Sequence, residues 1–173
     1  MNFVCVFDLD MTLYNSSDFI NSPIAHIYYN SFTKKSLLLY LLNTMPCAKF
    51  IFTNATHSHA KLVLETLGLR EIFPEKHIIS TDMIDNKLKP LLETYVLAEQ
   101  KFKIRAPQQT ILFFEDQLQN LVAAKKRNWT TILITDTRTT EACPDFVDYC
   151  FKNIEDALVY FSNVMKKDGI ISN

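Results

Sequence analysis

The sequence predicts a three-layer α/β domain, in which a doubly wound parallel sheet is covered by helices on both faces. Short apolar runs alternate along the chain with longer segments of helical periodicity. The apolar runs are continuous, as expected for parallel strands that are buried on both sides. The length of 173 residues suits a single domain spanning residues 1–173.

Each element follows from its local pattern. Leu62, Val63 and Leu67 lie on one side of a predicted helix, and Gly68 suits its left-handed end. Pro90 is expected to open a helix of about 12 residues, because proline is tolerated in a first turn. The helix with Leu62, Val63 and Leu67 is expected at 57–67, and the remaining helices at 34–43, 118–127 and 153–166. Strands are expected at 3–7, 49–52, 77–79, 111–114, 131–134 and 147–151.

Composition disfavours several classes of function. The net charge of −1 does not point to nucleic acid, and we read Lys125-Lys126-Arg127 as the last turn of a helix. No apolar run approaches the ~20 residues of a membrane helix, and the first residues lack the basic region of a signal peptide. With two glycines, the chain contains neither GxGxxG nor a P-loop.

Cysteine usage predicts a reducing compartment. The cysteines form no CxxC pair, and Cys5 and Cys150 lie in apolar runs that resemble strands. We therefore expect buried thiols and a cytoplasmic location.

Polar side chains follow three of the predicted strands at the point where each strand ends. They are Asp8 and Asp10, Thr53 and Asn54, and Glu115 and Asp116. The carboxyl ends of parallel strands meet at one edge of the sheet, where ligands bind. A single acid there is typically a cap or turn residue. Four converging carboxylates would repel one another without a cation, and their oxygen atoms suit Mg²⁺.

A lysine is the expected counter-charge. Lys87 and Lys89 both precede the helix predicted at Pro90. Either could reach the acidic cluster, and we prefer Lys89 because it lies directly before the proline.

These residues resemble the four motifs of the haloacid dehalogenase (HAD) superfamily, in order, over about residues 3–136. They are Asp8-Leu9-Asp10-Met11-Thr12, Phe52-Thr53-Asn54-Ala55, Lys89-Pro90, and Phe114-Glu115-Asp116 followed by Asn120. The resemblance implies a Rossmann-like core. The FDLDxTLY and FTNA stretches are most similar to the branch that contains pyrimidine 5′-nucleotidases.

The resemblance implies a Mg²⁺-dependent phosphomonoesterase with an aspartyl-phosphate intermediate. Asp8 would be the nucleophile, and Asp10 would be the general acid and base. Lys89 would neutralise charge on Asp8 and on the phosphoryl group. Thr12 would brace the loop, while Thr53 and Asn54 would bind the phosphoryl group. Asp8, Asp116 and the Asp10 carbonyl would hold Mg²⁺, with Glu115 as a ligand or close neighbour.

Asp10 also discriminates within the superfamily. The resemblance implies that metal-free dehalogenases lack this second acid, so its presence favours phosphoryl transfer. The rival hypothesis is a non-catalytic binding or scaffold protein with this fold. It is disfavoured because Asp8 and Asp10 are both present.

The short distance between the first two motifs bears on the substrate. About 43 residues separate Asp10 from Thr53, so the segment at about 15–45 can form only a flap and a reduced cap. An open site would admit a large substrate, such as a phosphoprotein or a nucleic-acid end, or would take its lid from a partner subunit in a homo-oligomer. A nucleotide or another small phosphoester also stays open, and the sequence names no single substrate.

The side chains around the mouth have open roles. Tyr14 is assigned to substrate binding, where it could stack on a base, although covering the core is an equal alternative. His57 and His59 are not expected to form a metal pair, because residues two apart do not share a helix face. One of them could line the mouth of the site.

Overall fold

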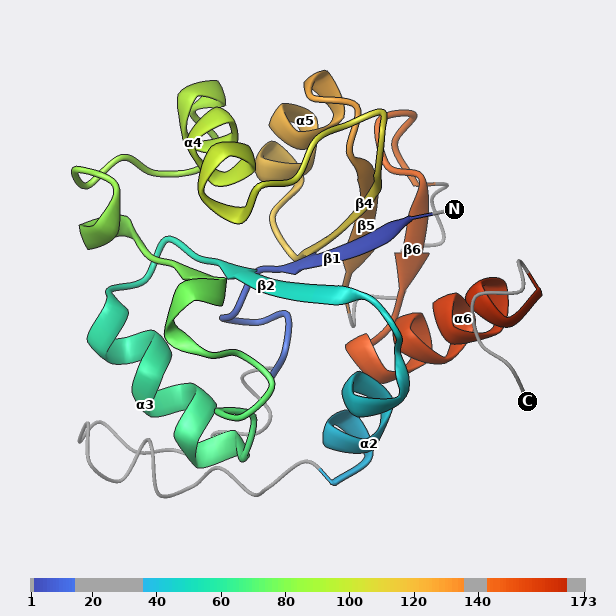
Figure 1. Cartoon of the computed structure of the whole chain (residues 1–173). Coiled ribbons are helices and arrows are strands. Elements are labelled where there is room, and N and C mark those ends of the chain that lie inside the picture. The colour runs from blue at the N-terminus through green and yellow to red at the C-terminus, as the bar shows by residue number, and fades with distance from the viewer. Residues whose placement is uncertain (1, 15–35, 136–142, 168–173) are drawn as a thin grey trace.

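A six-stranded parallel sheet forms the centre of the computed structural model, which describes residues 2–14, 36–135 and 143–167 (Figure 1). The strands run in the order β3-β2-β1-β4-β5-β6, and all neighbouring pairs are parallel. Their bounds are β1 (Phe3–Phe7), β2 (Ala48–Phe52), β3 (Ile78–Ile79), β4 (Thr110–Glu115), β5 (Thr130–Ile134) and β6 (Tyr149–Phe151). The predicted doubly wound fold is confirmed.

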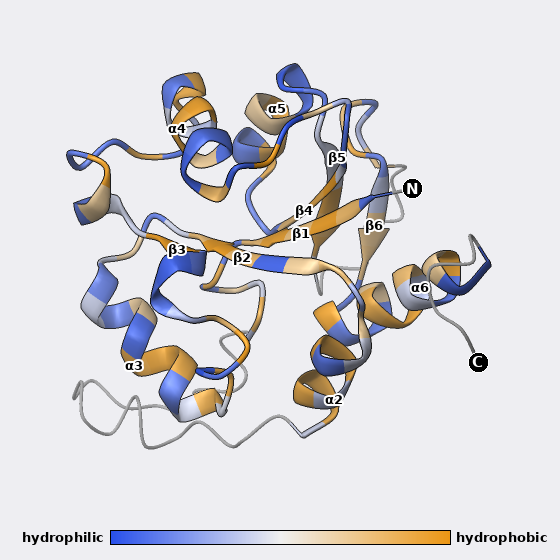
Figure 2. Cartoon of the chain, in the orientation of Figure 1, coloured by the Kyte–Doolittle hydropathy of each residue, from blue (hydrophilic) through white to orange (hydrophobic). Residues whose placement is uncertain are grey.

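Helices cover both faces of this sheet (Figure 1). One face is covered by α2 (Ser36–Thr44), α3 (His57–Leu67) and α6 (Ile154–Lys167), and the other by α4 (Leu92–Phe102) and α5 (Leu118–Lys126). Side chains of β1 alternate between the two cores: Cys5 and Phe7 pack in the first, Val4 and Val6 in the second. Hydrophobic residues accordingly dominate the central strands (Figure 2).

The ends of α3 follow from its sequence. The Thr56 side chain accepts a hydrogen bond from the His59 N–H at the start of the helix. Gly68 ends it in the left-handed region at φ 75°, as predicted.

The prediction that Pro90 opens a helix is wrong. The helix begins at Leu92, and the chain before it forms a turn in which the Leu91 N–H donates to the Leu88 carbonyl at 3.0 Å. This turn lets Lys89 point toward the sheet.

Other boundaries differ in detail. Strand β6 begins at Tyr149 because Val147 is held in a turn by the Pro144 carbonyl. Short 3₁₀ helices at Glu75–His77 and Thr81–Met83 were not predicted.

The cysteines divide into two pairs. The expectation of a buried thiol is wrong for Cys150, which forms a disulfide with Cys143. The turn between these residues brings their Cα atoms to 6.7 Å. Cys5 and Cys47 are free thiols with their sulfur atoms 3.3 Å apart.

The predicted flap and cap region is only partly described. Residues 15–35 lie outside the described residues, while 36–44 form α2. The buried side chains of Leu38, Leu41 and Leu42 anchor this helix in the core that it shares with α6. Among the described helices, none has the length and apolar character needed to cross a membrane.

Candidate active site

The carboxyl ends of three adjacent strands form the candidate site. Strand β1 leads into Asp8, β2 into Thr53, and β4 ends at Glu115. Backbone hydrogen bonds extend the sheet into the site, from the Asp8 N–H to the Phe114 carbonyl at 2.9 Å and from the Thr53 N–H to the Ile79 carbonyl at 3.0 Å. The first residues of the site are thus fixed by the sheet itself.

Lys89 lies at the centre of the site with its side chain completely buried. Its Nζ is 2.7 Å from Asp8 Oδ1 and 2.8 Å from Glu115 Oε2. Burial alone would lower the pKa of Lys89, but these two carboxylates outweigh burial and raise it. Lys89 is therefore charged. Lys87, the alternative left open by the sequence, pairs with Glu93 away from the cluster, at 2.5 Å.

Aromatic rings complete the environment of Lys89. The ammonium lies 5.2 Å from the ring centroid of Phe52 and 5.4 Å from that of Phe113. These distances suit cation–π contacts, which add to the ion pairs in a site without water around the charge.

Glu115 holds Lys89 in place. Its Oε2 accepts hydrogen bonds from Lys89 Nζ and from Asn120 Nδ2 at 3.0 Å. Its Oε1 accepts from the backbone N–H groups of Asp116 and Gln117 at 3.1 and 3.0 Å. With both oxygens engaged, Glu115 is better placed to support its neighbours than to ligate a metal directly.

The site carries more negative than positive charge. Oxygen atoms of Asp8, Glu115 and Asp116 lie within 4.8 Å of one another, and the Lys89 ammonium contacts two of these residues, Asp8 and Glu115. Burial and then Glu115 raise the pKa of Asp8, and the same two causes raise the pKa of Asp116 to about 7. A hard divalent cation would relieve this repulsion, so the residues present fit Mg²⁺.

Asp10 lies in the tight loop that follows β1. In this loop Met11 adopts the left-handed region at φ 64°, and the Leu13 N–H donates to the Leu9 carbonyl at 3.1 Å. Thr12 is buried, and its hydroxyl donates to Asp8 Oδ2 at 3.4 Å. The Asp10 carboxylate is outside the group of Asp8, Glu115 and Asp116.

Two side chains hold the Asp10 carboxylate. Tyr14 donates its hydroxyl to Oδ1, and His59 Nε2 lies 2.7 Å from the same oxygen. Burial would raise the pKa of Asp10, but the hydrogen bonds from His59 and Tyr14 outweigh it and lower the pKa. In the free site these hydrogen bonds favour the ionised form of Asp10.

Asn54 links the end of β2 to the turn that carries Lys89. Its Nδ2 donates to the Lys89 carbonyl at 3.0 Å, and its Oδ1 accepts the Lys89 N–H at 2.8 Å. Beside it, the Thr53 hydroxyl accepts the Ala55 N–H at 3.0 Å. The Asn54 side chain thus positions Lys89, and its role in binding a phosphoryl group stays a prediction.

Comparison with solved structures identifies the fold. An L-2-haloacid dehalogenase from Xanthobacter autotrophicus superposes with a TM-score of 0.69 at 12% identity, covering 93% of this chain and 98% of that one. A HAD phosphatase from Thermococcus onnurineus gives 0.68 at 14% identity, with the same coverages. The chain has the HAD fold. No family model and no curated protein sequence matches it.

A further neighbour with the HAD fold is a haloacid dehalogenase-like family protein from Streptococcus pneumoniae, with a TM-score of 0.62 at 17% identity, covering 92% of this chain and 98% of that one. These likenesses establish the architecture. They give no support to the pyrimidine 5′-nucleotidase branch, which stays a prediction.

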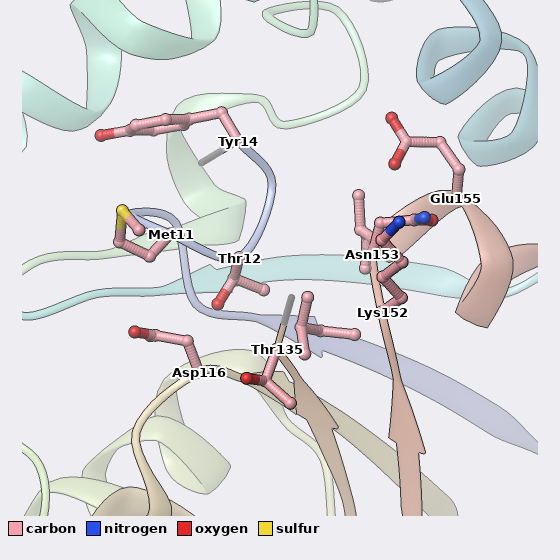
Figure 3. A pocket seen from close by; sticks show the side chains of 10 residues that line it. Met11, Thr12, Tyr14, Asp116, Thr135, Lys152, Asn153 and Glu155 are labelled. Atoms are coloured by element: carbon pink, nitrogen blue, oxygen red, sulfur yellow. The ribbon is translucent and has the colours of Figure 1, made fainter. Parts of the chain in front are cut away.

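A pocket of about 140 Å³ adjoins the acidic cluster of this HAD fold (Figure 3). The loop after β1 and the turn between β6 and α6 line opposite sides of it (Figure 3). Its lining surface is polar and apolar in about equal parts, and its residues are Thr12, Tyr14, Asp116, Thr135, Lys152, Asn153 and Glu155, with Met11, Ile134 and Ile154. Asp8 is not part of the lining, so the pocket lies beside Asp8 and not around it.

Sequence reasoning missed the contacts of His59 and Tyr14 with Asp10. His59 precedes Ala60, a buried residue of α3, and this helix begins directly after the motif at Thr53. That position at the carboxyl edge of the sheet was the available signal. His57 instead contacts Glu75, away from Asp10.

Proposed function

We propose that the protein is a Mg²⁺-dependent phosphomonoesterase that acts through an aspartyl-phosphate intermediate. The observation that carries this proposal is the composition of the acidic edge. Asp8 is paired with a buried ammonium, a second acid follows at Asp10, and Asp116 adds a further carboxylate within reach of Asp8. An anionic ester needs such an arrangement, because cations must offset its charge as it approaches an anionic nucleophile.

The residues that would hold Mg²⁺ are Asp8, Asp116 and the Asp10 carbonyl, with Glu115 supporting them. When bound, the ion would neutralise charge on the phosphoryl oxygens and orient the ester. Lys89 supplies the second positive charge at Asp8.

In the first half-reaction a carboxylate oxygen of Asp8 forms a bond to phosphorus while the bond from phosphorus to the ester oxygen breaks. The protonated form of Asp10 acts in this step and gives its proton to that leaving oxygen. In the second half-reaction Asp10 takes a proton from water. The water oxygen bonds to phosphorus, and the bond between phosphorus and Asp8 breaks, which restores the enzyme and releases phosphate.

The small volume of the pocket in Figure 3 supports a small leaving group. Its volume of about 140 Å³ is below the ~300 Å³ at which pockets for drug-sized ligands begin. We therefore prefer a small polar phosphoester as the substrate class. The test panel should contain a nucleoside monophosphate, another small phosphoester and a phosphopeptide. A cytoplasmic location and a homo-oligomer with a shared lid stay predictions.

One experiment tests this function. Purified protein should hydrolyse an aryl phosphate with Mg²⁺ and lose the activity with a chelator or in Asp8→Asn. Because haloacid dehalogenases share the fold, the same protein should be offered an L-2-haloacid without metal, and we expect no halide release. Halide release that depends on Asp8 would replace our proposal with dehalogenation. Equal inertness of wild type and Asp8→Asn on every substrate would favour the binding or scaffold role.

A further inference from the structure

The Asp10 carboxylate is held asymmetrically. His59 Nε2, at 2.7 Å, and the Tyr14 hydroxyl both contact Oδ1. Within the described part of the chain, no hydrogen bond reaches Oδ2. An ionised carboxylate only accepts hydrogen bonds, so His59 must carry its proton on Nε2 when it contacts that state of Asp10.

The two donors come from separately fixed parts of the fold. The Tyr14 ring is 2% exposed and belongs to the hydrophobic core beneath α3. His59 lies 49 residues from Asp10 in the first turn of α3, where Thr56 caps the helix and accepts the His59 N–H. Each donor is therefore set by packing or capping that does not depend on Asp10.

We propose that His59 and Tyr14 are positioning residues for Asp10. They fix Oδ1, so that Oδ2 carries the proton to the leaving oxygen and then accepts one from the hydrolytic water. This inference rests on the phosphomonoesterase function proposed above. It assigns a role to two side chains that the aspartyl-phosphate chemistry does not itself require.

A purely structural role is the competing explanation. The side chains of His59 and Asp10 are 24% and 38% exposed, and ion pairs at such exposure contribute little to stability. If the role were purely structural, a substitution would lower activity on all substrates equally. Loss of positioning would instead slow the proton-transfer steps alone.

Leaving groups separate the two explanations. 4-Nitrophenolate departs without a proton, whereas an alkoxide such as that from glycerol phosphate needs one. The value of kcat/KM reports formation of the aspartyl-phosphate. In His59→Ala we expect kcat/KM to fall by about 10²-fold for glycerol phosphate, in the range of general acid catalysis, and to change less than about threefold for 4-nitrophenyl phosphate.

The second half-reaction gives an independent readout. Asp10 must still deprotonate water, so His59→Ala should release a rapid burst of 4-nitrophenolate followed by slow turnover. His59→Gln, whose amide can donate near the position of Nε2, should restore most of the loss. Tyr14→Phe keeps the ring and should show the same leaving-group dependence as His59→Ala.

The matched control is His57→Ala, on the same helix but in contact with Glu75. Its kcat/KM for both substrates should equal that of wild type. If wild type is active and His59→Ala lowers kcat/KM for both substrates by the same factor, this inference is overturned while the proposed function stands. The same holds if His59→Ala lowers kcat/KM for neither substrate. A wild type that hydrolyses no phosphoester would overturn the proposed function as well.

Discussion

Lys89 is a buried charge that affects both the stability and the chemistry of the site. Its ammonium has no contact with water and is balanced by Asp8 and Glu115, which are themselves almost fully buried. The energy of taking these charges out of water is recovered only while all three are present. Lys89 therefore belongs to the stability of the sheet edge as much as to its chemistry.

Replacing Lys89 by methionine should lower the free energy of unfolding by about 3–5 kcal/mol, because two buried carboxylates would lose their partner. Urea denaturation followed by circular dichroism measures the change. Lys87→Met is the control, since Lys87 pairs with Glu93 near the surface, and its denaturation midpoint should stay that of wild type. Equal denaturation midpoints for all three proteins would show that the ion pairs of Lys89 with Asp8 and Glu115 do not stabilise the fold.

At the scale of elements, Asn54 connects β2 to the turn before α4. Asn54→Ala removes both of its hydrogen bonds to the Lys89 backbone. We expect a loss of about 1 kcal/mol in stability and a fall in kcat/KM of about tenfold or more, because small displacements of catalytic groups are costly.

Steady-state kinetics with an aryl phosphate and thermal unfolding measure these two effects. Asn43→Ala, at an exposed position of α2, is the control and should change neither. Wild-type activity in Asn54→Ala would mean that the turn holds Lys89 without help from β2.

Much of this arrangement could be predicted from the sequence, because it depends on local signals. Continuous apolar runs placed the strands, and parallel strands bring Asp8, Thr53 and Glu115 to one edge. The sequence places His59 near the carboxyl edge of the sheet, but its contact with Asp10 could not be predicted, because it depends on how α3 packs against the loop after β1. The start of α4 was misplaced since proline suits a turn as well as a first helical turn.

For the whole molecule, the surplus of carboxylates makes stability depend on pH and on metal. Burial and Glu115 raise the pKa of Asp116 from its ordinary value near 3.8 to about 7. Between these values the folded protein binds more protons at Asp116 than the unfolded chain does. The contribution of Asp116 to the free energy of unfolding therefore falls as pH rises from about 4 to about 7 when no metal is bound.

Thermal unfolding of wild type and Asp116→Asn with a chelator checks this sign. The melting temperature of wild type minus that of the variant should decrease between about pH 5 and about pH 8. Adding Mg²⁺ at the higher pH should raise the melting temperature of wild type and not of Asp116→Asn. The exposed Asp85→Asn serves as the control. A difference that does not vary with pH would contradict the raised pKa.

The central place of β1 has a consequence for how the site comes apart. This strand is buried along its whole length and hydrogen-bonded to both β2 and β4, so its amides should be among the slowest to exchange with solvent. Asp8 is attached to that strand, whereas His59 lies in the first turn of a helix, where fraying begins. On the proposed mechanism, fraying of α3 would leave a protein that still accepts a phosphoryl group from an activated ester but releases it slowly. If the proposed function holds, mild denaturant would thus cause the aspartyl-phosphate form of the protein to accumulate before the sheet unfolds.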